Sequence, residues 1–468
     1  MSKFLIYILL LSIIHSFLFY GNSLGLNVLL FIIPLLVFIF FVFKNKDLIN
    51  NKKGLLLMIP IILLSFSYFI YDNAVFKGLN AFVITWLFIL LYIYTVKPTF
   101  KLKQLISDTL YLIFEPLNHI GNLYKTTSLC LKETFKISHI NTKKIKSTLL
   151  VIPIILVVLI LLCSADMEFS NIFTDMFKFL DNISIDNIIG RTIVILLLFT
   201  YLGAVIDYLV VSYKDREEID KSNIKIENYT IKLLLVVLNV IYIVFDFIQI
   251  KSLMLHQVAE NINYAEYARS GFFQLMFISM INLVIILCSK RAKESDNTKS
   301  IKIMSVVMVL LTVVIIISSF FRMYMYESMY GYTLLRLLVY VTLFTEIVLL
   351  IPTVIYILNS KVNIFKHYLI ITLTVYTLLS LAPIDYVIAN NNINRYYRTN
   401  KIDLDYLQNY NSDNIPLLVD LYDKTNNKEI KEQIAIYFKE LNDQFEIDNF
   451  QEFNISKNKA IKEIKDFN

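Results

Sequence analysis

The sequence has few charged residues and few cysteines. Charged residues make up 18% of its 468 positions, whereas a soluble domain averages about 25%. Hydrophobic residues make up 57%, and the mean hydropathy is +0.62. The three cysteines, Cys130, Cys163 and Cys288, lack the spacing of a metal site or a paired redox motif. The composition therefore excludes an ordinary soluble domain, and we expect neither a disulfide nor a metal site.

Motifs of common enzyme classes are also missing. The chain has no GxxxxGK[ST] phosphate loop, no HExxH zinc motif and no GxSxG nucleophile turn. The short polar stretch at 21–23 carries no acidic residue. Multi-span, lipid-linked glycosyltransferases usually keep an acidic base in their first outer loop, so this class is disfavoured. We therefore expect no cofactor, and the sequence favours a protein that is not an enzyme.

Long apolar runs dominate the chain instead. Eleven of them have the length of a membrane-spanning helix, which needs roughly 20 residues. They cover residues 4–20, 24–43, 55–70, 79–96, 148–163, 192–211, 231–250, 271–288, 303–321, 334–358 and 368–387. The sequence therefore predicts an all-α fold, a polytopic transmembrane helix bundle of about eleven spans. The run at 55–70 is short, and it leaves the span count open.

The basic residues alternate between successive loops. If the N-terminus is cytoplasmic, the inner segments carry 25 lysines and arginines and the outer loops carry 6. Cationic loops stay in the cytoplasm. We therefore predict a multi-pass plasma-membrane protein with a cytoplasmic N-terminus and an extracytoplasmic C-terminus. The net charge of +6 then marks cytoplasmic loops, not a nucleic-acid-binding surface.

The same features divide the chain into four parts. They are a four-span region at 1–96, a basic segment at 97–147, a seven-span core at 148–387 and a tail at 388–468. The basic segment has apolar residues at helical spacing, which is typical of an amphipathic helix on anionic headgroups; a partner-docking helix is the alternative. The tail has soluble composition and predicts a small helical domain, which buries too little core to stand alone. We expect it to rest on the outer loops.

Charged and aromatic residues gather near the outer ends of the spans. Charge inside an apolar span is expensive, and buried charges need partners, so we predict that Arg322 and Arg336 pair with some of Asp246, Glu266, Glu327 and Asp385. The predicted polar cluster comprises Asp246, Tyr264, Glu266, Arg269, Arg322, Tyr326, Glu327, Tyr330, Gly331, Thr333, Arg336 and Asp385. Three interpretations are open: a clasp that orients helices, a site for an anionic headgroup or polar ligand, and a catalytic site.

Glu346 is the deepest acid of the apolar runs, midway along 334–358. Two interpretations are open for it. Either it carries or relays a proton, or it is a core acid whose hydrogen bonds are satisfied.

Two stretches carry a resemblance to a known family. Residues 264–273 read YAEYARSGFF, and residues 322–336 read RMYMYESMYGYTLLR. With FNISKNKA at 453–460 in the tail, they resemble an uncharacterised bacterial membrane family, domain of unknown function 4173. Ser270, Gln274 and Tyr332 depart from its usual residues. The resemblance implies a polytopic bacterial plasma-membrane protein and brings no activity, cofactor or catalytic residue.

These observations predict an integral membrane protein of unknown activity. Its polar cluster would bind or sense an envelope component, or brace the C-terminal tail. The alternative is a membrane-embedded transferase or transporter of lipid-linked envelope material. The expected partners are membrane lipids and an anionic lipid or other envelope ligand, not nucleic acid; the sequence identifies no protein partner.

Overall fold

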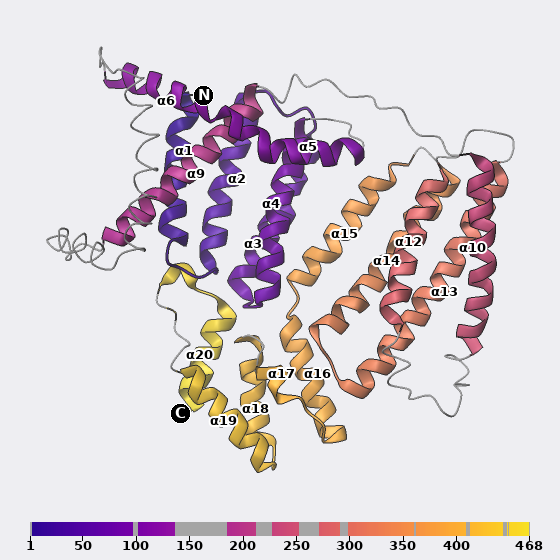
Figure 1. Ribbon diagram of the computed structural model, residues 1–468. Coiled ribbons are helices and arrows are strands. Elements are labelled where there is room, and N and C mark those ends of the chain that lie inside the picture. The colour runs from indigo at the N-terminus through magenta and orange to yellow at the C-terminus, as the bar shows by residue number, and fades with distance from the viewer. Residues whose placement is uncertain are drawn as a thin grey trace, which may run out of the picture. The chain divides into compact units, whose positions relative to one another are not determined.

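The computed structural model describes residues 2–96, 102–135, 185–211, 227–251, 271–290, 298–359, 362–408, 412–442, 447 and 449–467. These residues form helices and loops, with no strand among them, which confirms the all-α prediction. The helices, shown in Figure 1, are α1 (Ser2–Phe19), α2 (Leu26–Asn45), η1 (Lys52–Leu57), α3 (Met58–Ile70), α4 (Ala74–Val96), α5 (Leu102–Phe114), η2 (Glu115–His119), α6 (Ile120–Phe135), α9 (Ile185–Val211), α10 (Asn228–Gln249), α12 (Phe272–Ser289), α13 (Thr298–Tyr330), α14 (Leu334–Leu358), α15 (Ile364–Ser380), α16 (Ile384–Thr399), α17 (Leu404–Gln408), η5 (Ser412–Asn414), α18 (Ile415–Lys424), α19 (Lys428–Asn442), η6 (Phe450–Glu452) and α20 (Ile455–Phe467).

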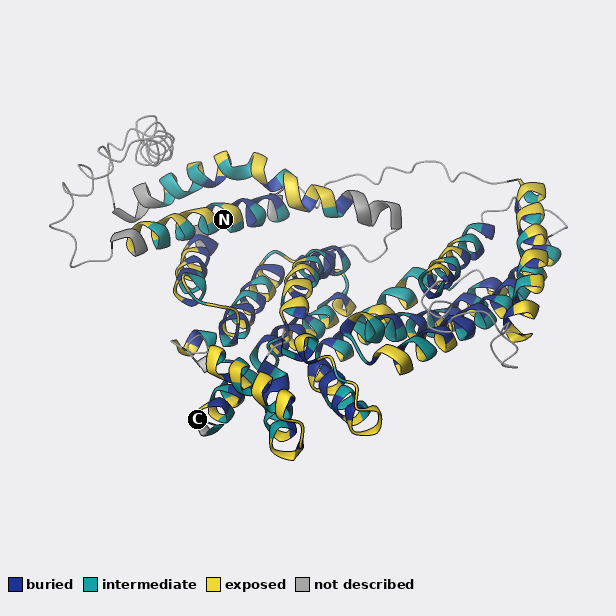
Figure 2. Cartoon of the chain, turned by 60° about the horizontal axis from the view of Figure 1, so that its bottom comes forward, coloured by how far each residue is buried: buried dark blue, intermediate teal, exposed yellow. Residues whose placement is uncertain are grey.

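Eight helices of the described residues are long and apolar enough to cross a membrane, or nine if the bent pair α15 and α16 forms one span. The apolar helix Phe4–Phe19 is shorter. Large apolar side chains such as Leu233, Val240 and Phe247 are exposed along α10, as lipid contact requires (Figure 2). The chain is therefore a multi-pass membrane protein. The predicted span at 148–163 lies outside the described residues.

The last predicted span, 368–387, ends earlier than expected. Helix α15 ends at Ser380, and α16 begins at Ile384 after a bend of 63°. Pro383 lies at the break, where it has no N–H with which to continue the helix. The N–H of Ala382 donates instead to Leu379 O at 3.1 Å. Asp385 therefore lies in the first turn of α16, not at the end of a straight span.

The described contacts form two compact units. The first comprises Met1–Phe69, Phe82–Glu218 and Asp448–Phe453, and the second comprises Ile70–Ala81, Ile219–Ile447 and Asn454–Asn468. The four-part division at 96, 147 and 387 stays a prediction.

In the first unit, α9 packs along α1 and against η2 and α6. His119 Nδ1 in η2 lies 3.0 Å from Asp207 Oδ2 in α9. The same unit contains a late segment of the chain, because the N–H of Leu26 donates to Phe453 O at 3.0 Å. Position 25 must be glycine there, since a Cβ would lie 2.5 Å from Glu452 O. The membrane-surface placement of the segment 97–147 stays a prediction.

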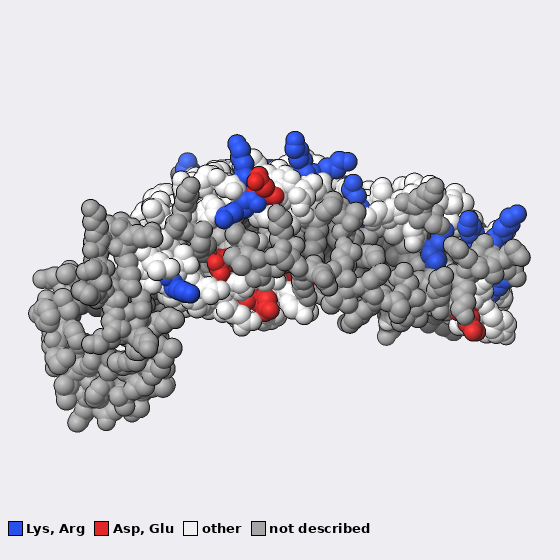
Figure 3. All heavy atoms as spheres, turned by 90° about the horizontal axis from the view of Figure 1, so that it is seen from above, with Lys and Arg blue, Asp and Glu red and all other residues white. Residues whose placement is uncertain are grey.

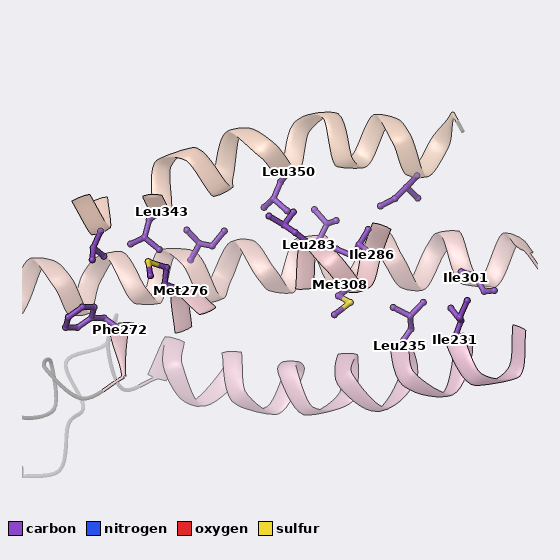
Figure 4. Close-up of a cluster of buried hydrophobic side chains, with 14 of the residues drawn as sticks. Ile231, Leu235, Phe272, Met276, Leu283, Ile286, Ile301, Met308, Leu343 and Leu350 are labelled. Atoms are coloured by element: carbon purple, nitrogen blue, oxygen red, sulfur yellow. The ribbon is translucent and has the colours of Figure 1, made fainter. Parts of the chain in front are cut away.

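In the second unit, α10, α12, α13 and α14 share one apolar core. Figure 4 shows Ile231 of α10 and Ile301 of α13 at one end of this core, and Phe272 of α12 and Leu343 of α14 towards the other. Each of these helices is therefore antiparallel to the one before it in the chain. The turn between α13 and α14 lies at the end of the bundle where α12 begins.

The tail has a core of its own, to which α16 contributes. Its buried residues come from α16 to α20 and are Ala389, Ile393, Tyr396, Leu404, Leu407, Ile415, Leu418, Leu421, Ile430, Ile434, Phe438, Ala460 and Ile464. The prediction of a small helical tail is confirmed.

Candidate functional site

The turn between α13 and α14 lies at the centre of the predicted polar cluster. Gly331 has a φ of +85°, a left-handed conformation that favours glycine, and its N–H donates to Glu327 O at 2.7 Å. Thr333 is the N-cap of α14, and its hydroxyl oxygen accepts from the N–H of Arg336 at 3.4 Å. The tight turn brings the acid at the end of α13 and the base at the start of α14 close together.

Arg336 is held within this turn. Its guanidinium donates to Gly331 O and lies 4.4 Å from the centroid of the Tyr326 ring, which is a cation–π contact. The side chain of Glu327 is buried, interacts electrostatically with Arg336 and lies beside the Tyr332 hydroxyl. The turn therefore holds a buried acid and a base that donates a hydrogen bond to the turn itself.

Helix α16 of the tail binds the same turn. Asn392 Nδ2 donates to Tyr332 O at 2.8 Å, and Asn392 Oδ1 accepts from the N–H of Tyr332 at 2.9 Å. Arg395 donates to Ser328 O at 3.4 Å and to Met329 O at 2.5 Å. The last carbonyls of a helix have no partner within it, and a cation there suits the helix dipole. The tail thus satisfies backbone groups at the end of α13.

A further tail contact lies at the start of α14. The Tyr406 hydroxyl accepts from the N–H of Leu334 at 2.8 Å, which is one of the donors that a helix start leaves open. The approach is close, since a Cβ at Gly331 would lie 2.6 Å from Asn392 Oδ1. Side chains of the tail therefore contact the backbone of the turn directly, and there is no room for a side chain at Gly331.

Arg322 lies on the α10 side of the bundle. Its Nη2 donates to Gln249 Oε1 at 3.1 Å. A Cβ at Gly271, which has a φ of +113°, would lie 2.6 Å from Arg322 Nη1. Gly271 belongs to the first stretch that carries the family resemblance and Arg322 begins the second, so the two stretches meet here. Asp246, one turn before Gln249, is 4% exposed, and its carboxyl oxygens have no hydrogen-bond partner among the described residues.

A second polar site joins the loop between α3 and α4 to the tail. Asn73 Nδ2 lies 2.9 and 2.8 Å from the two carboxyl oxygens of Asp385. The Ser412 hydroxyl donates to Asp72 Oδ2 at 2.6 Å, and Lys77 Nζ lies 2.5 Å from Asp72 Oδ1. We call this site the acidic cluster, which comprises Asp72, Asn73, Lys77, Asp385, Ser412 and Asp413.

Asp413 has a perturbed pKa within the acidic cluster. Burial raises the pKa of its carboxyl group to about 7, and the neighbouring carboxyl groups of Asp385 and Asp72 raise it as well. The N–H of Asp72 and the charge of Lys77 act in the opposite direction. One ammonium group thus faces three carboxyl groups, and the acidic cluster changes its charge near neutral pH.

The predicted cluster residues lie at three places in the second unit. The turn holds Tyr326, Glu327, Tyr330, Gly331, Thr333 and Arg336, the α10 side holds Asp246 and Arg322, and the acidic cluster holds Asp385. Tyr264, Glu266 and Arg269 lie outside the described residues, so their place in the cluster stays a prediction. Arg336 interacts electrostatically with Glu327, and one donor of Arg322 bonds to the amide of Gln249; the pairing of Arg322 with an acid stays a prediction.

Sequence reasoning missed the residues through which the tail contacts the turn and the loop between α3 and α4. They are Asp72, Asn73, Lys77, Asn392, Arg395, Tyr406, Ser412 and Asp413. A signal existed for two of them, because Asp72 and Asn73 interrupt two apolar runs. No signal existed for Asn392, because it is one of three consecutive asparagines and nothing in the sequence distinguishes it from the other two.

The described residues include no group of three or more His, Cys, Asp or Glu side chains arranged to hold a metal ion.

A family model described as "Domain of unknown function (DUF4153)" matches residues 58–421. The prediction of domain of unknown function 4173 named a different family, but an uncharacterised family stands. The match covers most of the chain and includes the bundle, the turn and the acidic cluster. No curated protein and no solved structure matches the chain.

Proposed function

The chain belongs to the DUF4153 family, and we propose that it is a non-enzymatic plasma-membrane protein of bacteria that holds a helical domain on the outer ends of its spans. The observation that carries this proposal is the pair of hydrogen bonds between Asn392 and the backbone of Tyr332. They bind the tail to the turn at the centre of the polar cluster. The polar cluster then braces the tail.

The charge distribution supports an outward tail. Lys290 follows the end of α12, Lys299 and Lys302 begin α13, and Lys366 begins α15. In the part of Figure 3 that these helix ends occupy, the coloured residues in view are mainly Lys and Arg. The turn between α13 and α14, which binds the tail, is at the opposite end of the same helices. Since cationic ends stay in the cytoplasm, the tail lies outside.

The polar contacts favour bracing over ligand binding by the cluster itself. The Arg336 guanidinium donates to Gly331 O and stacks on Tyr326, and Arg322 donates to Gln249. A transferase or transporter that uses these arginines needs their donors turned towards a substrate. An envelope component would therefore be bound or sensed by the surface of the tail.

Limited proteolysis tests the brace. We would digest intact cells that carry wild type, Asn392→Ala or the control Asn394→Ala, which changes an exposed residue of the same helix. Removing Asn392 leaves two backbone groups without partners, which costs about 1–3 kcal/mol for each buried group. We expect Asn392→Ala to speed cleavage of the tail and Asn394→Ala to leave it unchanged. Equal cleavage of all three proteins would contradict bracing, and cleavage that requires permeabilised cells would contradict an outward tail.

A further inference from the structure

Polar side chains line the interior of the α10–α14 bundle. On α10, α12 and α14 they recur at intervals of three or seven residues, which keeps them on or near one face, and on α13 Ser318 and Ser319 are adjacent. The buried ones are Asn239, Asp246 and Gln249 on α10, Ser279, Asn282 and Ser289 on α12, Ser305, Thr312, Ser318, Ser319, Arg322 and Glu327 on α13, and Glu346 and Thr353 on α14. Large apolar side chains are exposed along the same helices. Polar groups at membrane depth are expensive and mark ion or proton pathways more often than chance.

Several of these side chains are joined by hydrogen bonds. The Tyr242 hydroxyl donates to Asn282 Oδ1 at 2.8 Å, and Asn282 Nδ2 donates to Thr312 Oγ1 at 3.0 Å. The Thr312 hydroxyl donates in turn to Met308 O at 2.7 Å. Side chains of α10, α12 and α13 thus form one connected chain through the bundle.

Glu346 bonds to this interior through Ser279. Ser279 Oγ lies 2.7 Å from Met276 O and is also hydrogen-bonded to Glu346 Oε2. A hydroxyl group has one hydrogen to donate, and a helical serine often donates it to a carbonyl of the preceding turn. When it does so, the bond to Glu346 needs a hydrogen on the carboxyl group, and when Ser279 donates to Glu346 Oε2 instead, the carboxylate form is accommodated. The geometry thus provides a place for a proton between Glu346 and Ser279.

Asp246 lies at the same depth as this pair. Because α10 and α12 are antiparallel and Tyr242 meets Asn282, Asp246 comes level with Ser279, one turn away on each helix. Asp246 and Glu346 are 4% and 2% exposed. Both oxygens of Asp246 and Oε1 of Glu346 have no hydrogen-bond partner among the described residues. Two buried carboxyl groups with open oxygens therefore share one level of the bundle.

Several ionisable groups among the described residues of the surrounding helices bond to other partners. Of the cations, Lys290 at the end of α12 donates to Ile357 O, Arg322 to Gln249 and Arg336 to Gly331 O. Glu327 lies at the turn. The hydroxyls of Tyr368 and Tyr376 on α15 bond to Thr353 and Asn80, and that of Tyr242 to Asn282. An isolated carboxylate at this depth is far more costly than a neutral carboxyl group.

We propose that Glu346, with Ser279 as its hydrogen-bond partner and Asp246 at the same level, is a proton-binding site of the bundle. The protein takes up and releases protons at membrane depth. The hydrogen bonds that join Tyr242, Asn282 and Thr312 lie beside the site. This activity goes beyond bracing the tail, and it stands if the bracing is disproved.

Infrared difference spectroscopy of the purified full chain tests the proposal. A neutral carboxyl group has a C=O stretch that is distinct from the carboxylate bands and shifts in D₂O. We expect wild type to show such a band that decreases on a step to high pH, and Glu346→Gln to show a smaller one, because Asp413 also loses its proton in this range. Gln keeps the shape and neutrality of the protonated acid. The control is Glu440→Gln, at an exposed position of α19, and it should retain the band.

Proton counting with a pH-sensitive dye is the second measurement. On the same alkaline step, Glu346→Gln should release one proton fewer per chain than wild type and Glu440→Gln. Ser279→Ala removes the partner without touching the acid, and it should shift the carboxyl band. Identical spectra and proton release for wild type and Glu346→Gln would overturn the proposal. A band that neither responds to pH nor shifts in D₂O would also overturn it, since that acid does not exchange its proton.

Discussion

Asn73 and Asp385 are hydrogen-bonded across 312 positions of the chain. The amide nitrogen of Asn73, between α3 and α4, lies 2.9 and 2.8 Å from the two carboxyl oxygens of Asp385 in α16. Asn73 Oδ1 accepts from the N–H of Phe76 at 3.0 Å and so caps α4 at the same time. Both side chains are buried. A single amide thus fixes the start of one helix and the first turn of another.

This pair predicts that Asn73→Asp destabilises the protein and that adding Asp385→Asn restores stability. Asn73→Asp places a second carboxylate against Asp385, and a buried charge without a partner costs on the order of 3–5 kcal/mol. We expect Asn73→Asp to lower the melting temperature of the purified chain at neutral pH. Asp385→Asn in the same chain removes the repulsion and restores one amide and one carboxylate. The double variant should therefore melt well above Asn73→Asp; melting at or below the single variant would contradict the contact.

The pKa of Asp413 predicts that tail docking weakens with rising pH. Its pKa is about 7 in the folded chain, compared with about 3.9 for an unperturbed Asp. The folded state thus binds the proton more tightly than the unfolded state. Its contribution to stability is fully present below about pH 4 and is lost as the pH rises through about 7.

Thermal unfolding at pH 5 and pH 8 measures this dependence. Asp413→Asn keeps the neutral shape, so it should melt higher than wild type at pH 8 and show a smaller difference between the two pH values. Asp423→Asn, at an exposed position of α18, should behave as wild type does. If the melting temperature of Asp413→Asn depends on pH as steeply as that of wild type, groups other than Asp413 cause the dependence and the prediction is contradicted.

Gly331 predicts a large effect of one methyl group. Alanine would adopt a φ of +85° and place its Cβ 2.6 Å from Asn392 Oδ1. The left-handed conformation costs roughly 1–2 kcal/mol, and displacing Asn392 adds to this loss. We expect Gly331→Ala to lower the melting temperature and the amount of protein in membranes. Gly78→Ala is the matched control, since no atom lies within 4 Å of its Cβ; comparable losses in both variants would contradict this explanation.

Arg336 predicts that lysine is a poor replacement. A guanidinium group can donate to Gly331 O and stack on Tyr326 at once, whereas an ammonium group lacks the planar stacking face. We expect Arg336→Lys to lose about 1 kcal/mol of unfolding free energy, measured by thermal or denaturant unfolding. Arg398→Lys on the exposed side of α16 should lose nothing measurable. Equal stability of Arg336→Lys and wild type would mean that the stacking contributes no energy.

The helices could be predicted because lipid leaves the backbone few choices. A span must bond its own N–H and C=O groups, so an apolar run of sufficient length is a helix. The end of α15 was predicted wrongly because composition stays apolar up to residue 387, while Pro383 breaks the backbone pattern that composition does not record. The proline was visible in the sequence, and its missing N–H and fixed φ end the helix although the surrounding residues are apolar.

The polar contacts could be predicted only in part. Glu327 and Arg336 meet because a glycine turn joins consecutive helices, and such local contacts follow from spacing. Asn73 and Asp385 meet through tertiary packing between distant parts of the chain, which periodicity does not encode. Arg322 donates to Gln249, since a neutral amide oxygen also satisfies a buried donor, and its pairing with an acid stays a prediction.

Site-specific thiol labelling tests the central claim, an outward tail braced on the spans, most directly. In a chain without Cys130, Cys163 and Cys288, Asn394→Cys places one thiol on the tail and Lys366→Cys places one at the basic end of α15; both positions are exposed. A membrane-impermeant maleimide should label Asn394→Cys on intact cells and Lys366→Cys only after permeabilisation. The reverse pattern would place the tail in the cytoplasm and contradict the account.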